Sequence, residues 1–192
     1  MSQRNETDRL LDAARECVLA VGVRRTTVTD VARRAGVSRM TLYRRFPDLE
    51  ALLAALMTRE FGRLVAQGRN GSGGATTRER VVAMVVEGSR ALAGDPLFVR
   101  LVDVDPELLL PYVTVRLGGM QKMAVAAAAA ELAAADDSVR TDAPPQVLAA
   151  GIELIARGFV LAAHGELEPA LDPWTELGRA VDGYLRPGGR TA

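Results

Sequence analysis

Residues 26–46 constrain the local fold more than any other stretch of the sequence, because they contain the start and stop signals of two short helices. Thr27 lies three residues before Asp30, a spacing close to that of a capping box, and this predicts a helix start. Gly36 predicts the end of this helix, since glycine adopts a positive φ at little cost. Ser38 is a favourable N-cap for the next helix. The stretch therefore predicts two helices joined by a tight turn.

The second predicted helix has an apolar face and a basic face. Leu42 and Phe46 lie four residues apart, so both can pack against the first helix. At about 100° per residue, Met40 and Arg44 point away from Leu42. The residues predicted to face DNA, including the N-cap of the first helix, are Thr27, Ser38, Arg39, Met40, Thr41, Tyr43, Arg44 and Arg45. We expect this face to enter the major groove of double-stranded DNA.

The chemistry of these residues suits DNA. An arginine can donate two hydrogen bonds to guanine or bind a phosphate, and the hydroxyls of threonine and tyrosine reach phosphates. The free N–H groups of the helix that begins after Thr27 can bind another phosphate. The alternative is an ordinary helical hairpin with a solvated basic face. The agreement of both caps, the Gly-Val-Ser turn and the Tyr-Arg-Arg-Phe ending favours a DNA-binding helix-turn-helix.

The distribution of charge supports the same prediction. The formal net charge is zero, with 24 basic and 24 acidic residues. Residues 1–46 contain 10 arginines and 5 acidic residues, a net charge of +5, whereas residues 47–192 contain 14 basic and 19 acidic residues, a net charge of −5. A basic end on an acidic body is typical of a chain that binds nucleic acid through one end.

The sequence offers little for catalysis or metal binding. It has one histidine and one cysteine, so a zinc-type cluster of these residues is not expected. His164 is expected near a helix end. Cys17 is expected to be a small core residue, with redox sensing as the less favoured alternative. No catalytic residue, metal or cofactor is predicted, and no feature of the sequence supports an enzyme.

No targeting segment or membrane span is expected. The N-terminal residues lack the charged region and the apolar region of a secretory signal. No run of 18 uncharged apolar residues occurs, so the sequence predicts no transmembrane helix. We therefore expect a cytoplasmic protein with no membrane partner.

Helical periodicity continues beyond the helix-turn-helix and predicts an all-α fold. The further helices are expected over residues 7–21, 48–67, 78–93, 96–102, 108–135, 145–164 and 173–185, and the glycine-rich residues 68–77 are expected to form a loop. We predict two domains. Residues 1–47 would form an N-terminal three-helix domain with the helix-turn-helix, and residues 48–192 a larger helical domain.

A series of short motifs covers residues 8–57. In chain order they are the apolar positions Leu10, Leu11, Ala14, Val18 and Val21, then Gly22, Thr26-Thr27-Val28, Asp30-Val31-Ala32, Ala35-Gly36-Val37-Ser38, Thr41-Leu42-Tyr43, Phe46-Pro47 and Glu50-Ala51-Leu52. This series resembles the TetR family of transcriptional repressors. The resemblance implies a sequence-specific DNA-binding regulator, a repressor that a small-molecule effector releases from its operator.

The sequence departs from the family pattern at two positions. Met40 stands where the family usually has a small residue, so this chain is expected to read different bases or to dock at a shifted angle. Leu49 stands where a lysine that binds phosphate is common in the family. Arg44 and Arg45 can replace the charge of that lysine.

The resemblance also assigns roles to the larger domain, residues 48–192. It implies effector binding by the middle helices and pairing of the last two helices in a homodimer on a palindromic operator. The candidate pocket residues are Met84, Glu87, Phe98, Leu101, Tyr112, Arg116, Met120 and Phe159. Simple core packing is the alternative role for each of them. For the whole chain, the alternative is a helical sensor or scaffold of the same fold that does not bind DNA specifically.

Overall fold

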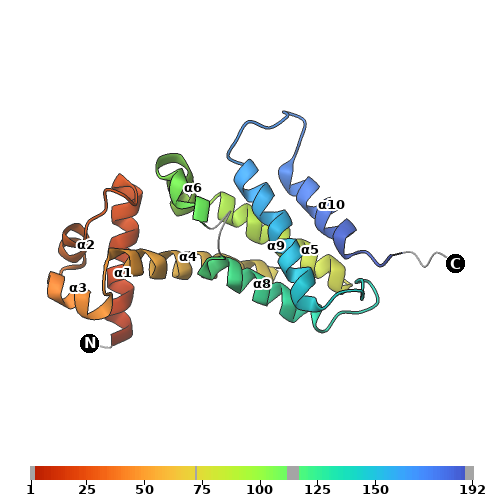
Figure 1. Ribbon diagram of the computed structural model, residues 1–192, viewed down its shortest axis with the longest axis horizontal. Coiled ribbons are helices and arrows are strands. Elements are labelled where there is room, and N and C mark those ends of the chain that lie inside the picture. Colours follow the sequence, from red (N-terminus) through yellow and green to blue (C-terminus); the bar gives the residue numbers. More distant parts are fainter. Residues whose placement is uncertain (1–2, 72, 112–116, 189–192) are drawn as a thin grey trace. The chain divides into compact units, whose positions relative to one another are not determined.

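The computed structural model describes residues 3–71, 73–111 and 117–188, and every regular element in these ranges is helical (Figure 1). The elements are α1 (Gln3–Val21), α2 (Val28–Ala35), α3 (Arg39–Arg45), α4 (Leu49–Gly71), α5 (Thr77–Ala93), α6 (Pro96–Val104), the 3-10 helix η1 (Pro106–Leu108), α8 (Gly119–Leu132), α9 (Pro145–Ala162) and α10 (Pro173–Leu185). The predicted all-α fold is confirmed. The chain forms two compact units, and these are described separately below.

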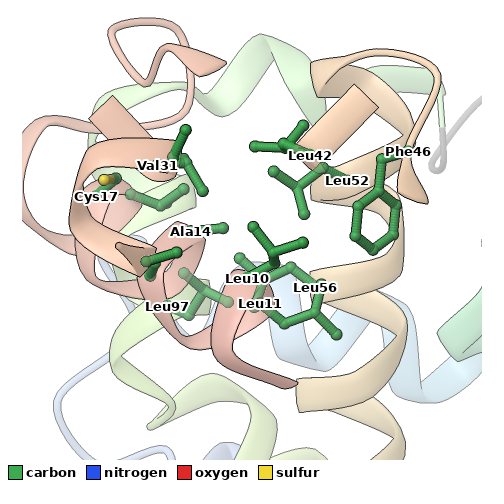
Figure 2. Packing of buried hydrophobic residues seen from close by; sticks show 14 residues of the cluster. Leu10, Leu11, Ala14, Cys17, Val31, Leu42, Phe46, Leu52, Leu56 and Leu97 are labelled. Carbon is green, nitrogen blue, oxygen red and sulfur yellow. The ribbon is translucent and has the colours of Figure 1, made fainter. Parts of the chain in front are cut away.

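The first unit comprises Met1–Phe61 and Asp95–Gly119, and one apolar core holds its helices together. Figure 2 shows this core, in which Leu10 of α1, Leu42 of α3 and Leu52 of α4 lie close together. All three are fully buried. Burial of one leucine side chain contributes about 1.5–3 kcal/mol to folding. This core therefore fixes how α2 and α3 lie on α1.

The core of the first unit extends past the predicted domain boundary at residue 47. Leu56 of α4 and Leu97 of α6 are fully buried in it. The compact unit thus takes in the first half of α4 and the segment that begins at Asp95. The assignment of DNA binding to residues 1–47 and of effector binding and dimerisation to residues 48–192 stays a prediction.

Asp105, directly after α6, joins this segment to the turn between α1 and α2. Its carboxylate is 2% exposed and accepts a hydrogen bond of 2.7 Å from the backbone N–H of Val23. Gly22 beside it has a φ of +86°, and a Cβ there would lie 2.8 Å from Asp105 Oδ2. The turn therefore needs glycine both for its backbone conformation and for the close approach of Asp105.

Two further contacts hold the same turn. Arg100 of α6 donates to the carbonyl oxygen of Ala20 at 3.3 Å, and Glu107 of η1 accepts from Arg24 at 2.6 Å. The turn leads directly to the start of α2. Polar contacts from residues 100–107 thus position the entry to the helix-turn-helix.

The second unit comprises Gly62–Gly94 and Met120–Ala192, and its core lies among α5, α8, α9 and α10. The helices α5, α9 and α10 pack against one another, as Figure 1 shows. Val81, Leu177 and Leu185 are fully buried there. This unit is a helical bundle in which apolar stripes at helical spacing meet at a common centre.

The glycine-rich residues 68–77 are only partly a loop, which corrects the prediction. The helix α4 continues to Gly71, and α5 begins at Thr77. Gly68 is buried, and a Cβ there would lie 3.1 Å from the carbonyl oxygen of Met84 in α5. The glycine therefore serves close packing of α4 on α5 and does not end the helix.

The continuous helix predicted over residues 108–135 is also wrong. Residues 106–108 form the 3-10 helix η1, residues 117–118 are not helical, and α8 begins at Gly119. Gly118 and Gly119 are adjacent, and each glycine costs about 1 kcal/mol in the interior of a helix. The glycine pair accounts for the late start of α8.

Within the described ranges, one helix, α9, is long and apolar enough to cross a membrane, judged by length and composition alone. Its mean hydropathy is 1.4, and 28% of its residues are buried. Two charged residues, Glu153 and Arg157, interrupt its apolar run. Glu153 is buried, accepts a hydrogen bond of 2.8 Å from Gln121 of α8 and lies 3.5 Å from the Arg157 guanidinium. In the second unit, α9 thus has polar partners and packs on α5 and α10.

Asp136, after α8, holds the start of α5. Its carboxylate accepts a hydrogen bond of 2.9 Å from the backbone N–H of Thr77, and the Thr77 hydroxyl accepts from the N–H of Asp136 at 3.3 Å. The hydroxyl and the N–H of Ser138 also donate to this carboxylate. These donors, the Ser138 hydroxyl foremost, lower the pKa of Asp136 from 3.8 to about 2. The carboxylate therefore stabilises the fold in its ionised form.

Replacing Asp136 by Asn should lower the free energy of unfolding at pH 7, because the carboxylate that accepts these hydrogen bonds is lost. A lowered pKa stabilises the folded state above the unfolded value of 3.8, and this contribution is lost as the pH falls toward about 2. The difference between Asp136→Asn and the unaltered protein should therefore shrink between pH 4 and pH 2, as measured by urea unfolding. Asp137→Asn, at an exposed neighbour, is the control. A difference that grows as the pH falls would contradict this assignment.

Replacing Asp105 by Ala should lower the free energy of unfolding by about 1–3 kcal/mol, because the N–H of Val23 loses a charged partner in a poorly solvated turn. Denaturant unfolding measures this change. Asp103→Ala removes an exposed carboxylate from the same segment and should leave the stability nearly unchanged. Equal effects of the two substitutions would show that the Asp105–Val23 contact does not hold the turn.

Candidate nucleic-acid interface

The two ends of α2 are capped by the residues that the sequence predicts, Thr27 and Gly36. The Thr27 hydroxyl accepts a hydrogen bond of 3.1 Å from the N–H of Asp30 and donates to its carboxylate at 2.5 Å. Gly36 has a φ of +65°, and Arg9 of α1 donates to the carbonyl oxygen of Ala35 at 2.6 Å. Both predicted caps of this helix are therefore confirmed, and α1 itself supplies one partner at its end.

The start of α3 is capped by Ser38, as predicted. Its hydroxyl accepts from the N–H of Thr41 at 3.1 Å, and the two hydroxyls lie 3.0 Å apart. At the other end, the N–H of Phe46 donates to the carbonyl oxygen of Leu42 at 2.9 Å. Leu42 is fully buried and Phe46 is 9% exposed. The predicted inner face of α3 is therefore confirmed.

The opposite face of α3 is turned to solvent. Met40 is 70% exposed and Tyr43 is 48% exposed. Arg39, Arg44 and Arg45 are exposed as well, and so are Thr27 and Ser38, whereas Thr41 is half-buried. All the predicted residues except Thr41 are thus exposed, and their contact with DNA stays a prediction.

Hydrogen bonds divide these residues into two groups, which sequence reasoning did not separate. Arg45 donates to the hydroxyl of Thr7 in α1 at 2.7 Å, and Thr41 is engaged with Ser38. No described residue forms an ion pair or hydrogen bond with the side chains of Arg39 or Arg44. Two guanidinium groups are therefore available for phosphates or base edges without giving up an internal partner.

Leu49 occupies the position where the family commonly has a lysine, and it has a structural role here. It is half-buried and packs on the core of the first unit. Asp48 before it caps α4, because its carboxylate accepts from the N–H of Ala51 at 2.7 Å. The first turn of α4 therefore presents an apolar contact to the protein at this position.

Cys17 is a buried residue whose thiol is kept in its protonated form by its surroundings. The side chain is 4% exposed in the core of the first unit. Desolvation raises the pKa of its thiol, and the nearby Arg34 partly opposes this effect. A thiol that stays protonated is a weak nucleophile, so the structure favours the core role over redox sensing.

The described residues of the predicted pocket are divided between the two compact units. Phe98 and Leu101 are buried in the first unit, where the Phe98 ring packs edge-on against Phe61 at 5.9 Å. In the second unit, Met84 is buried, Met120 and Phe159 are half-buried, and Glu87 is exposed and lies 3.3 Å from Arg90. Tyr112 and Arg116 lie outside the described residues. The assignment of all these residues to an effector pocket stays a prediction.

Sequence reasoning missed one buried polar group in the second unit. Gln121, 6% exposed, and Glu153, 9% exposed, form a hydrogen bond, and Arg157 lies beside them. The signal in the sequence was the spacing of Glu153 and Arg157, four residues apart in an otherwise apolar helix. The partner on α8 could not be inferred from that spacing.

Comparison with known proteins supports the same interpretation of this surface. The family described as "Bacterial regulatory proteins, tetR family" matches residues 10–56. An uncharacterised HTH-type transcriptional regulator of Mycobacterium tuberculosis is 36% identical over 92% of this chain and 93% of its own length. The HTH-type transcriptional repressor KstR of the same species is 37% identical over 50% of this chain and 44% of its own length.

A solved structure shows the same fold over nearly the whole chain. The transcriptional repressor QsdR of R. erythropolis, from the TetR family, superposes with a TM-score of 0.72 at 19% identity and covers 96% of each chain. The matched family region contains the caps, the turn and the exposed face of α3 described above. The similarity to the mycobacterial regulator extends across both units. The chain therefore belongs to the TetR family of DNA-binding, helix-turn-helix transcriptional regulators.

Proposed function

We propose that this regulator is a homodimeric repressor that binds a palindromic operator and that a small-molecule effector releases. The observation that carries the proposal is the solvent-facing surface of α3, where Arg39 and Arg44 have no partner among the described residues. Guanidinium groups held on a short, capped helix can donate to guanine in the major groove. The caps and the buried Leu42 limit the rotation of α3, so this surface is already formed before DNA binds.

Dimerisation is supported by an apolar face on α9. Val147 is 55% exposed and Leu154 is 59% exposed, and Leu161, half-buried, follows at the same spacing of seven residues. Residues seven apart lie on one face of a helix. Such a stripe would be buried if α9 and α10 paired with the same helices of a second copy in a four-helix bundle. The low buried share of α9 agrees with a helix that needs a further partner.

A two-fold dimer has a direct consequence for the DNA. Two copies of α3 related by symmetry would enter successive major grooves, about 34 Å apart, and read a palindrome. Selection of bound sequences from a random pool of duplexes tests this directly. Recovery of a palindrome would support the proposal. If no sequence is enriched and a gel shift detects no specific binding, the alternative is favoured, a sensor or scaffold of this fold.

Release by an effector requires two states of the dimer with different spacing of the two α3 helices. An effector that binds the state with the wrong spacing lowers DNA affinity by its differential binding energy, typically about 1–3 kcal/mol. The helix α4 is suited to couple the two functions, because its residues belong to both compact units. The candidates for effector contact stay the eight residues predicted from the sequence. A compound that binds the protein and leaves operator affinity unchanged is not such an effector.

Replacing Arg44 by Ala should weaken binding to the selected operator by about 1–3 kcal/mol, because the substitution removes a guanidinium group that is expected to contact the DNA. Fluorescence anisotropy at fixed salt measures the change. Arg90→Ala, at an exposed arginine of the second unit, is the control and should leave affinity unchanged. Arg45→Ala should have the smaller effect of the two α3 substitutions, since Thr7 engages this side chain. The reverse order would contradict the division of the surface described above.

Replacing Leu154 by Arg should convert the dimer to a monomer, because a charge would be placed in the centre of the apolar face of α9. Analytical ultracentrifugation at micromolar concentration measures the mass. Met40→Arg introduces the same charge at an exposed apolar position of α3 and should leave the mass unchanged. A monomeric mass for the unaltered protein would rule out the proposed dimer.

A further inference from the structure

Met40 is the most exposed of the large apolar side chains in the described residues, at 70%. It lies in the first turn of α3, directly after Arg39 and two residues before the buried Leu42. An apolar side chain in this position gains nothing from the protein core. Any partner of the Met40 side chain must therefore be a molecule outside this chain.

The neighbours of Met40 show which surface it belongs to. Arg44 follows four residues later on the same face of α3, and no described residue engages its guanidinium. Thr41 and Arg45 form the next row, and both are engaged, Thr41 with Ser38 and Arg45 with Thr7. The row of Met40 and Arg44 is therefore an apolar group and a cation side by side, both directed away from the core of the first unit.

The chemistry of a thioether limits what Met40 can recognise in a major groove. It has no N–H or O–H to donate, and its sulfur is a weak acceptor. The C5-methyl group of thymine is the apolar group that base pairs present in the major groove. The unbranched, polarisable side chain of methionine adapts well to such a contact.

We propose that Met40 is a specificity-determining residue that contacts the C5-methyl group of one thymine in each half of the operator. The proposal rests on the DNA-binding function of the family and names the base feature that this chain reads. Burial of one methyl group is worth about 0.8 kcal/mol, which corresponds to about a fourfold change in affinity for each thymine.

Arg44 sets a second condition on the operator. Residues four apart along an α-helix are separated by about 6 Å, and successive bases of one strand by about 3.4 Å. A guanine that accepts hydrogen bonds from Arg44 is therefore expected within about two base pairs of the thymine. Met40 and Arg44 together would therefore recognise a thymine and a nearby guanine, and not the thymine alone.

The test removes only the methyl group. The full-length protein selects its preferred duplex from a random pool, and each thymine of that duplex is then replaced in turn by deoxyuridine. One thymine in each half should lose about fourfold in affinity on this replacement. In Met40→Ala, the same replacement should have no effect, because the side chain that contacts the methyl group is gone. Met40→Leu should keep part of the sensitivity.

Two controls separate this result from a general loss of binding. Val21→Ala truncates an apolar side chain that is 37% exposed at the end of α1 and should leave the sensitivity to deoxyuridine intact. Unchanged thermal unfolding of Met40→Ala shows that the substitution does not disturb the fold. Sensitivity at one position that vanishes only with Met40→Ala supports the proposal.

Three results would overturn it. They are a selected duplex without thymine in its conserved half, no sensitivity to deoxyuridine at any thymine, and a sensitivity that Met40→Ala retains. In each of these cases the protein still binds its selected duplex, so the DNA-binding function stands. If the pool yields no enriched sequence, both the function and the role of Met40 fall.

Discussion

Burial of Leu42 is the constraint on which the functional surface depends. This side chain is fully buried in the core of the first unit, and its position fixes the rotation of a helix that is only seven residues long. A helix of this length is not stable alone, so its orientation must come from packing. Once Leu42 is inside, Met40 and Arg44 face outward by the geometry of the helix. The chemistry of the surface follows from one apolar contact.

Hydrogen bonds refine what packing establishes. The caps at Thr27 and Ser38 satisfy backbone N–H groups at the start of α2 and α3, and Arg9 satisfies a carbonyl oxygen at the end of α2. The two caps act within α2 and α3, and the Arg9 contact joins the end of α2 to α1. They also engage some of the side chains that could otherwise meet DNA. The division between engaged and available groups on α3 is therefore a result of the same contacts that hold it in place.

Two buried polar contacts occur where segments distant in sequence meet. Asp105 joins the segment after α6 to the turn before α2, across 82 residues of sequence. Gln121 and Glu153 join α8 to α9 inside the second unit. A buried carboxylate is costly unless it is hydrogen-bonded, so each fixes one particular arrangement of its neighbours. In the first unit, this arrangement positions the turn that leads into α2.

Local signals in the sequence determined the helices α2 and α3, the turn at Gly36, the inner and outer faces of α3 and the family, because capping and helical periodicity act over a few residues. Only the tertiary structure decided that Leu97 completes the N-terminal core, that Gly68 packs on α5 within a continuing helix, and that Arg45 is engaged by Thr7 while Arg44 is not. Each of these depends on residues at least 16 positions apart meeting in space. Such meetings are set by how whole helices pack, which no local pattern of side chains specifies.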